Sequence, residues 1–294
     1  MGAIDERGAG GEATHADENR MRHEPSRDGL CFSSATDIGR LRDRNEDFIG
    51  DPKSFELLVG GPRELEERGW LFAVADGMGG HARGEVASRL AVETLFAAFY
   101  GGPPGSGDPM ERLKRAFSTA NSAVYRAGHL VTPDDSDSSS PDVPLPRMGT
   151  TLVAAVVMRH TVFIGNVGDS RAYLLEGNRM LQVSEDHSIV AEEVRLGLVG
   201  AEEARNLPLR NVITRALGAR ESVEPDVFWR TWPQEGRLLL CSDGLHGPLK
   251  DHIIESTLKK QAPEEAVRRL IDAANEAGGP DNISAIVVAQ GTAA

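Results

Sequence analysis

Apolar and polar residues alternate in blocks along this chain of 294 residues. Short apolar runs, rich in β-branched residues and bounded by Gly, Asp, Asn or Ser, indicate buried strands that end in turns. The runs are WLFAVAD (70–76), TTLVAAVVM (150–158), TVFIGNV (161–167), RAYLL (171–175), RLLLCSD (237–243) and ISAIVVAQ (283–290). Only Gly-Asp-Ser separates the third run from the fourth, so we expect these two strands to form an antiparallel hairpin.

Other segments repeat their apolar residues at helical spacing. They are GEVASRLAVETLFAAFY (84–100), ERLKRAFSTANSAVYRA (111–127) and APEEAVRRLIDAANEAGG (262–279). The last begins with a proline in its first turn and ends in two glycines, as helices commonly do. Strands gathered mid-chain with helices beside them favour a layered α+β domain over a regular βαβ repeat.

Two segments lack the apolar residues that a packed core needs. Residues 1–28 are rich in Gly, Glu, Asp, Arg and His, which predicts a disordered N-terminal segment. Residues 131–147, with the sequence VTPDDSDSSSPDVPLPR, are expected to form a long flexible loop. The remainder, 29–294, is long enough to bury the core of one large domain.

The charge of the chain narrows the choice of partner. It has 32 Lys+Arg against 45 Asp+Glu, a formal net charge of −13. Such an acidic protein is unsuited to nucleic acid or an anionic membrane as its main partner, but it suits cations. Two cysteines do not indicate a disulfide framework, and no signal-peptide-like or membrane-spanning run is present. We therefore expect a cytoplasmic protein.

Carboxylates recur at the edges of the apolar runs, next to Gly, Ser or Asn. They are Asp76, Asp169, Asp243, Asp281 and the pair Glu46–Asp47. Any one of them alone reads as an ordinary turn residue. Their repeated occurrence in the same context indicates that several strand ends meet and bring these side chains together.

Crowded carboxylates raise one another's pKa unless cations neutralise them. Oxygen ligands of this kind suit Mg²⁺ or Mn²⁺, and the chain has no Cys/His cluster of the zinc type. A glycine such as Gly77 lets a backbone carbonyl approach an ion. Arg42, three residues before Asn45, is either a surface arginine or the partner of a phosphate dianion, which its planar fork can bind at two oxygens.

The ordered set of motifs resembles the metal-dependent Ser/Thr protein phosphatases of the 2C type (the PPM family) in their bacterial form. The matching pieces are TDIGRLRDRNED, VADGMGGHARGEVAS, MGTTLV, GNVGDSRAY, EDHSIV, NVITRALG, CSDGL and GGPDNIS, which together span about residues 33–291. The resemblance implies a four-layer αββα sandwich, in which two packed antiparallel sheets are flanked by helix pairs. It makes residues 29–294 the phosphatase catalytic domain.

The resemblance also implies roles for the carboxylates in holding two Mn²⁺ or Mg²⁺ ions. Asp76 would bridge the ions, Glu46 and the carbonyl of Gly77 would complete one sphere, and Asp243 and Asp281 the other. Asp47 would act through metal-bound water. Asp169 would help to hold a third, looser ion.

Further expectations concern the substrate side of the site. Arg42 would bind the substrate phosphate, and residues 186–217 would form the mobile flap of the family. Met78 stands where some relatives, mainly eukaryotic ones, have a histidine. The acid that protonates the leaving group therefore stays open, with nearby His81 as one candidate.

The function implied is hydrolysis of phosphoserine and phosphothreonine in proteins, by attack of a water that bridges two ions. The partners implied are phosphorylated proteins, substrates of a Ser/Thr kinase, and the family favours a monomer. Two alternatives stay open at this point. One is a non-catalytic phosphoprotein-binding scaffold of the same fold, and the other is a phosphoesterase acting on small phosphate esters.

Overall fold

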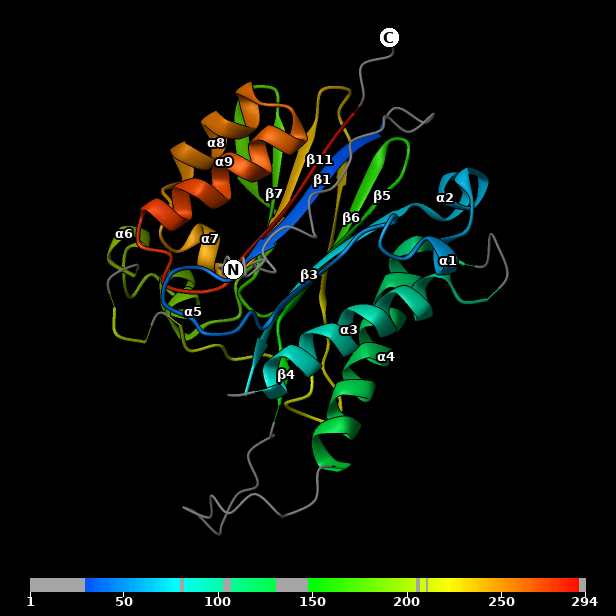
Figure 1. Cartoon of the computed structure of the whole chain (residues 1–294), viewed down its shortest axis with the longest axis horizontal. Helices are drawn as coiled ribbons and strands as arrows, with labels where there is room; N and C mark the ends of the chain where they lie inside the picture. The colour runs from blue at the N-terminus through cyan, green and yellow to red at the C-terminus, as the bar shows by residue number, and fades with distance from the viewer. Residues whose placement is uncertain are drawn as a thin grey trace, which may run out of the picture.

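The chain folds into two β-sheets packed face to face with helices outside them (Figure 1). This computed structural model describes residues 30–79, 82–102, 107–130, 148–204, 207–209 and 211–290. The expected disordered segment 1–28 and the expected loop 131–147 lie outside the described residues. Both therefore stay predictions.

The first sheet contains both ends of the described chain. Its strands, in spatial order, are β1 (Leu30–Asp37), β11 (Ile283–Gln290), β10 (Arg237–Cys241), β7 (Arg171–Glu176) and β8 (Arg179–Gln182). Every neighbouring pair is antiparallel. We call this the five-stranded sheet, counting only strands that the structure describes.

The second sheet is built from the middle of the chain. Its strands, in order, are β2 (Asp47–Gly50), β3 (Trp70–Met78), β5 (Leu152–Val157), β6 (Thr161–Val167) and β9 (Asp226–Thr231), and the short β4 (Gly149–Thr150) pairs with the end of β3. These pairs are also antiparallel. With β4 included, this is the six-stranded sheet of the described chain.

The hairpin expected for 161–175 is wrong. β6 pairs with β5 and β9 in the six-stranded sheet, whereas β7 pairs with β10 and β8 in the five-stranded sheet. The Gly-Asp-Ser segment therefore crosses from one sheet to the other. Gly168 makes this possible with φ +107°, a left-handed conformation that other residues avoid. Most residues of both strands are buried, so pairing follows tertiary neighbours rather than the short connection.

The helices form two outer layers. α3 (Ala82–Tyr100) packs on the six-stranded sheet together with α4 (Pro109–Leu130), and α9 (Pro263–Glu276) packs on the five-stranded sheet together with α8 (Asp251–Lys260) (Figure 1). The predicted apolar face of α9 is buried as expected. Shorter helices are α1 (Glu56–Val59), α2 (Pro62–Arg68), α5 (Ile189–Arg195), α6 (Ala201–Ala204) and α7 (Asp243–His246).

The apolar core lies in layers that match this arrangement. One cluster fills the space between the sheets and continues under α3 and α4, with Phe72, Leu152 and Ile286 fully buried in it. A second cluster lies between the five-stranded sheet and α8 and α9, around Leu239 and Leu270. The four-layer α+β sandwich is therefore confirmed. Cys31 and Cys241 are both free thiols, and each described helix is too short or too polar to cross a membrane.

Candidate active site

The strand ends of the five-stranded sheet bring three of the predicted carboxylates together. Because its strands are antiparallel, β7 begins, β10 ends and β11 begins at the same end of the sheet. Asp169 lies two residues before β7, Asp243 directly follows Ser242 after β10, and Asp281 lies two residues before β11. All three carboxylates therefore lie at the same end of the sheet.

The six-stranded sheet contributes the other carboxylates to the same place. Asp47 and Asp76 lie directly opposite each other in the β2–β3 pair, and Glu46 precedes Asp47. The two sheets are joined here, because the Ser242 hydroxyl donates to Asp47 Oδ2 at 2.7 Å. The convergence expected from the sequence is thus present.

The carboxylates strongly affect one another's protonation. Burial, followed by the negative charge of Asp47, holds the pKa of Asp76 well above its usual range. Burial also raises the pKa of Asp47 to about 7 and that of Asp169 to about 8, with the charge of Asp243 adding to both. The pKa of Asp243 is raised by burial and by Asp281. So many acids within electrostatic range are stable as anions only beside positive charge.

Two carboxylate oxygens of this cluster have the properties expected of metal ligands. Asp47 Oδ1 and Asp243 Oδ1 are buried and lack a hydrogen-bond partner, whereas buried polar atoms almost always have one. Among the described residues, no three His, Cys, Asp or Glu side chains already form a closed ion-binding group. The orphaned hard oxygens and the raised pKa values nevertheless fit divalent cations of the Mg²⁺ and Mn²⁺ type.

Glycines allow the backbone to approach Glu46 closely. A Cβ on Gly77 would lie 2.1 Å from the Gly84 carbonyl oxygen, and one on Gly84 would lie 2.8 Å from Glu46 Oε2. The Gly77 amide donates to the Glu46 carbonyl at 3.1 Å, and the Ser88 hydroxyl donates to it at 2.6 Å. Burial raises the pKa of the Glu46 side chain. No larger residue fits at either glycine without moving the backbone that holds Glu46.

Arg42 is held against one of the predicted metal ligands. Its Nη2 donates to Asp281 Oδ2 at 2.7 Å, while its side chain stays 52% exposed. The neighbouring Asn282 donates its amide to Asp281 Oδ1 and accepts the Glu46 amide on its side-chain oxygen. The side-chain nitrogen of Asn282 donates to the carbonyls of Ile38 and Arg44. One asparagine therefore orients the whole loop that carries Arg42 and Glu46.

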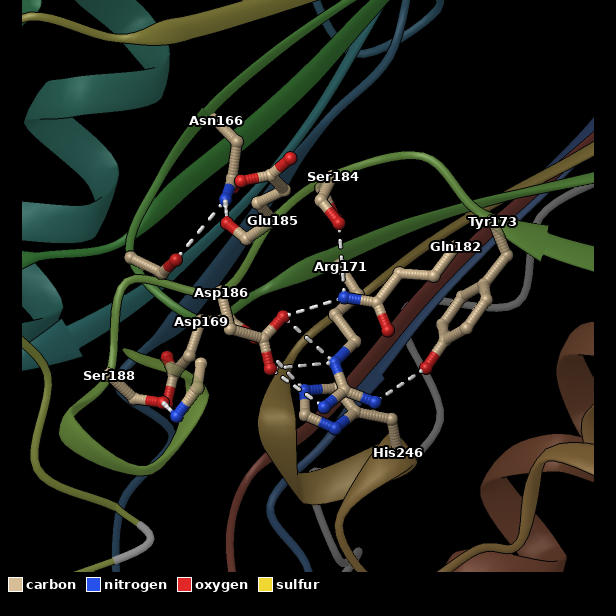
Figure 2. A network of polar contacts seen from close by, with 12 residues as sticks. Asn166, Asp169, Arg171, Tyr173, Gln182, Ser184, Glu185, Asp186, Ser188 and His246 are labelled. Carbon is tan, nitrogen blue, oxygen red and sulfur yellow. Dashed lines mark hydrogen bonds and ion pairs between the residues drawn. The ribbon is translucent and has the colours of Figure 1, made fainter. Parts of the chain in front are cut away.

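Asp169 lies beside a partly buried ion pair that the sequence did not reveal. Figure 2 shows the Arg171 guanidinium facing the Asp186 carboxylate, with nitrogen–oxygen distances of 2.7 to 3.0 Å. Tyr173 accepts a further bond from Arg171 at 2.9 Å. His246 Nε2 lies 3.0 Å from the Asp169 carbonyl oxygen. Helix α7 thus contacts the backbone of Asp169 through His246, and the ion pair lies on the β7 side.

The expected flap, residues 186–217, lies outside both sheets and contains α5 and α6 in its described part. His187, close to its start, accepts the Gly168 amide on Nδ1, so Nε2 is the donor to Asp226 Oδ2 at 3.0 Å. Arg215, close to its end, donates to Asp226 Oδ1 at 2.7 Å. Burial alone would raise the pKa of Asp226, but these two hydrogen bonds outweigh it and lower the pKa. One carboxylate on β9 therefore holds both ends of the segment.

Two other expected positions have different outcomes. Met78 is the last residue of β3, two residues beyond Asp76. His81, the candidate acid, lies outside the described residues and stays a prediction.

Sequence reasoning missed Thr151, Ser242 and Asn282. These residues hold the backbone or side chains of Asp76, Asp47 and Glu46. The signal in the sequence was their position next to an acid or in a motif. Hydroxyl and amide residues occupy such positions in ordinary turns as well, so the signal is weak.

A family model described as protein phosphatase 2C matches residues 63–287. The chain belongs to the protein phosphatase 2C family. A similar curated protein, the serine/threonine phosphatase stp of Listeria welshimeri, is 38% identical over 256 residues, 86% of this chain and 93% of that protein. The predicted enzyme class, a protein-serine/threonine phosphatase, is confirmed by this match and the family model.

Solved structures of the family share the fold. The serine/threonine phosphatase Stp1 of Staphylococcus aureus has a TM-score of 0.76 and 30% identity, covering 94% of this chain and 100% of that one. The catalytic domain of the serine/threonine phosphatase PstP, solved in complex with two manganese ions, has a TM-score of 0.72 and 33% identity. That alignment covers 90% of this chain and 99% of the solved catalytic-domain chain.

Proposed function

We propose that this 2C-type phosphatase hydrolyses phosphoserine and phosphothreonine in proteins with two Mn²⁺ or Mg²⁺ ions. The observation that carries the proposal is the meeting of buried carboxylates from both sheets, with raised pKa values and two orphaned oxygens. The substrates would be phosphoproteins produced by a Ser/Thr kinase. The two manganese ions in PstP support the choice of cofactor.

The residues that would hold the ions are those assigned from the motifs: Glu46, Asp76, Gly77 through its carbonyl, Asp243 and Asp281, with Asp169 for a third ion. Bound divalent ions lower the pKa of a coordinated water toward about 7 and offset charge on a phosphoryl group. Asp76, which lies in β3 opposite Asp47, would contribute to both ions. Asp47 would hold ordered water with the oxygen that Ser242 leaves unpaired.

Arg42 would bind and orient the phosphoryl group of the substrate. Its guanidinium has four further N–H donors besides the one directed at Asp281. Because the side chain is half exposed, it can turn toward an incoming dianion without breaking a buried contact. Fixing the phosphoryl group in this way supplies the positioning on which phosphoryl transfer depends.

The experiment measures Mn²⁺-dependent hydrolysis of p-nitrophenyl phosphate and of phosphothreonine peptides. We expect activity that EDTA abolishes and Mn²⁺ restores, and a loss of at least about 100-fold in Asp76→Asn, since electrostatic groups in such sites contribute on this scale. Asp272→Asn on the exposed face of α9 is the matched control. Wild-type rates in Asp76→Asn would refute the assignment of Asp76.

The same assay separates the two alternatives. A scaffold would bind phosphopeptides without turnover at any Mn²⁺ concentration. A small-molecule phosphoesterase would turn over nucleotides faster than phosphothreonine peptides. We expect neither result.

A further inference from the structure

Thr151, between β4 and β5, forms hydrogen bonds with both the backbone amide and the backbone carbonyl of Asp76. Its amide donates to the Asp76 carbonyl oxygen at 2.9 Å, and its hydroxyl oxygen accepts the Asp76 amide at 3.0 Å. Thr151 is only 1% exposed. Because buried amides need a partner, the Asp76 amide depends on this hydroxyl for its hydrogen bond.

The same hydroxyl reaches across to the other sheet. Thr151 Oγ1 lies 2.7 Å from the hydroxyl oxygen of Ser170, which is fully buried and directly follows Asp169. A hydroxyl carries one hydrogen and two lone pairs, so Thr151 can serve Asp76 and Ser170 together. One side chain thus connects the residues that carry the Asp76 and Asp169 carboxylates.

The methyl group of Thr151 makes a separate contact with Gly168, in the segment that joins β6 to β7. A Cβ on Gly168 would lie 2.6 Å from both Cβ and Cγ2 of Thr151, so the turn before Asp169 packs directly on the threonine. The polar and apolar halves of Thr151 therefore touch the same crossing between the sheets. Because the hydroxyl and the methyl group make different contacts, a substitution that removes only one of them can separate their effects.

We infer that Thr151 is a positioning residue, whose hydroxyl bridge to the Asp76 amide and to Ser170 sets the relative position of the Asp76 and Asp169 carboxylates for divalent-ion binding. The inference rests on the proposed function, because it concerns the ions that this site would hold. The Thr151 hydroxyl is engaged by Asp76 and Ser170, so it acts through the two aspartates. A carboxylate pair drawn from two different sheets needs such a link, since metal affinity falls steeply when supporting contacts are lost.

The test compares Thr151→Val, which keeps the shape and removes the hydroxyl, with Thr151→Ser, which keeps the hydroxyl and removes the methyl. Thr257→Val in α8 is the control, because it removes a threonine hydroxyl that is bonded within a helix and lies far from Thr151 in the sequence. Isothermal titration with Mn²⁺ measures affinity, and hydrogen exchange measures protection of the Asp76 amide. Thermal melting in EDTA shows that each variant folds.

We expect Thr151→Val to bind Mn²⁺ about 10-fold more weakly and to lose protection at the Asp76 amide, as second-layer contacts to metal ligands typically require. Thr151→Ser and Thr257→Val should stay within about twofold of wild type, well below the loss expected for a missing supporting bond. Ser170→Ala, which leaves the Asp76 contact in place, provides the second test if Thr151→Val does not fold. It should weaken Mn²⁺ binding in the same direction.

Unchanged Mn²⁺ affinity in folded Thr151→Val, or in Ser170→Ala where the first variant fails to fold, would overturn the inference. An equal loss in Thr151→Ser would also overturn it, because the methyl contact with Gly168 would then be responsible. Both results leave the proposed function intact, since wild type would still bind Mn²⁺ and hydrolyse phosphopeptides. A wild-type protein that binds no Mn²⁺ would remove both proposals at once.

Discussion

Glycines allow the close backbone contacts that position the acids of this site, and a larger residue would not fit there. A Cβ on Gly244 would lie 2.0 Å from the carbonyl oxygen of Asn282, the asparagine that orients Glu46. Sequence reasoning found the acids and Gly77 because Asp followed by Gly at a strand end is visible as a pattern. It missed Asn282 and Ser242, because their importance lies in contacts with residues about 200 or more positions away.

Gly244→Ala should lower Mn²⁺-dependent activity, by roughly 10- to 100-fold, because displaced supporting groups reduce activity on this scale. The new methyl group must push Asn282 or helix α7 aside, which moves Asp243 and the loop of Glu46 together. Steady-state hydrolysis of p-nitrophenyl phosphate measures the effect. Gly200→Ala, where an added Cβ meets nothing within 4 Å, should behave as wild type. Full activity in Gly244→Ala would show that this close packing has no role in the site.

At the scale of elements, the sequence predicted which segments form strands and helices better than how they pair. The apolar runs ending at Asp76 and Asp243 are β3 and β10, and the stripe at 262–279 is α9. The expected hairpin between β6 and β7 failed, because a buried strand carries no signal for which sheet it joins. Pairing there is decided by β5 and β10, which lie elsewhere in the chain.

The segment expected to form the flap, residues 186–217, gives a prediction at this scale. Asp226→Asn keeps the size of the side chain but leaves one acceptor for two donors, so either His187 or Arg215 loses its partner. We expect backbone amides close to the two ends, such as that of Thr214, to exchange hydrogen roughly 10-fold faster, because hydrogen bonds to charged groups contribute on this scale.

Hydrogen-exchange mass spectrometry of peptides from 187–217 measures this change. Glu224→Gln removes a charge of the same sign two residues away and should leave exchange unaltered. Identical exchange in Asp226→Asn and wild type would mean that backbone hydrogen bonds between the two ends of this segment, such as Thr214 with His187, hold it without the carboxylate.

The whole molecule concentrates negative charge where its two sheets meet. The resemblance of ordered motifs correctly predicted the four-layer sandwich, because most of these motifs lie at strand ends that the fold brings to this corner. It could not give the hydroxyl and amide contacts between the sheets, since these arise only once the layers pack. The consequence for the metal-free protein is a stability that depends on pH.

The free energy of unfolding in EDTA should fall as pH rises from about 6 to 9. The pKa of Asp47 is about 7 and that of Asp169 about 8 in the folded protein, against about 3.9 for an unfolded aspartate. The folded state therefore binds more protons than the unfolded state over this range. The stabilisation is present at low pH and is lost as each group ionises, by up to about 1.4 kcal/mol per pH unit and group.

Thermal melting across this pH range measures the effect. Added Mn²⁺ should restore the lost stability at pH 8, because it binds the ionised carboxylates of the folded state only. A melting temperature in EDTA that rises between pH 6 and 9 would contradict the electrostatic account of the site.

The most direct measurement of the central claim is anomalous X-ray diffraction from crystals of the protein grown with Mn²⁺. The account predicts two manganese peaks within coordination distance of the Asp76 carboxylate. One of them should also be coordinated by Asp243 and Asp281. Saturating Mn²⁺ without an anomalous peak at Asp76 would contradict it.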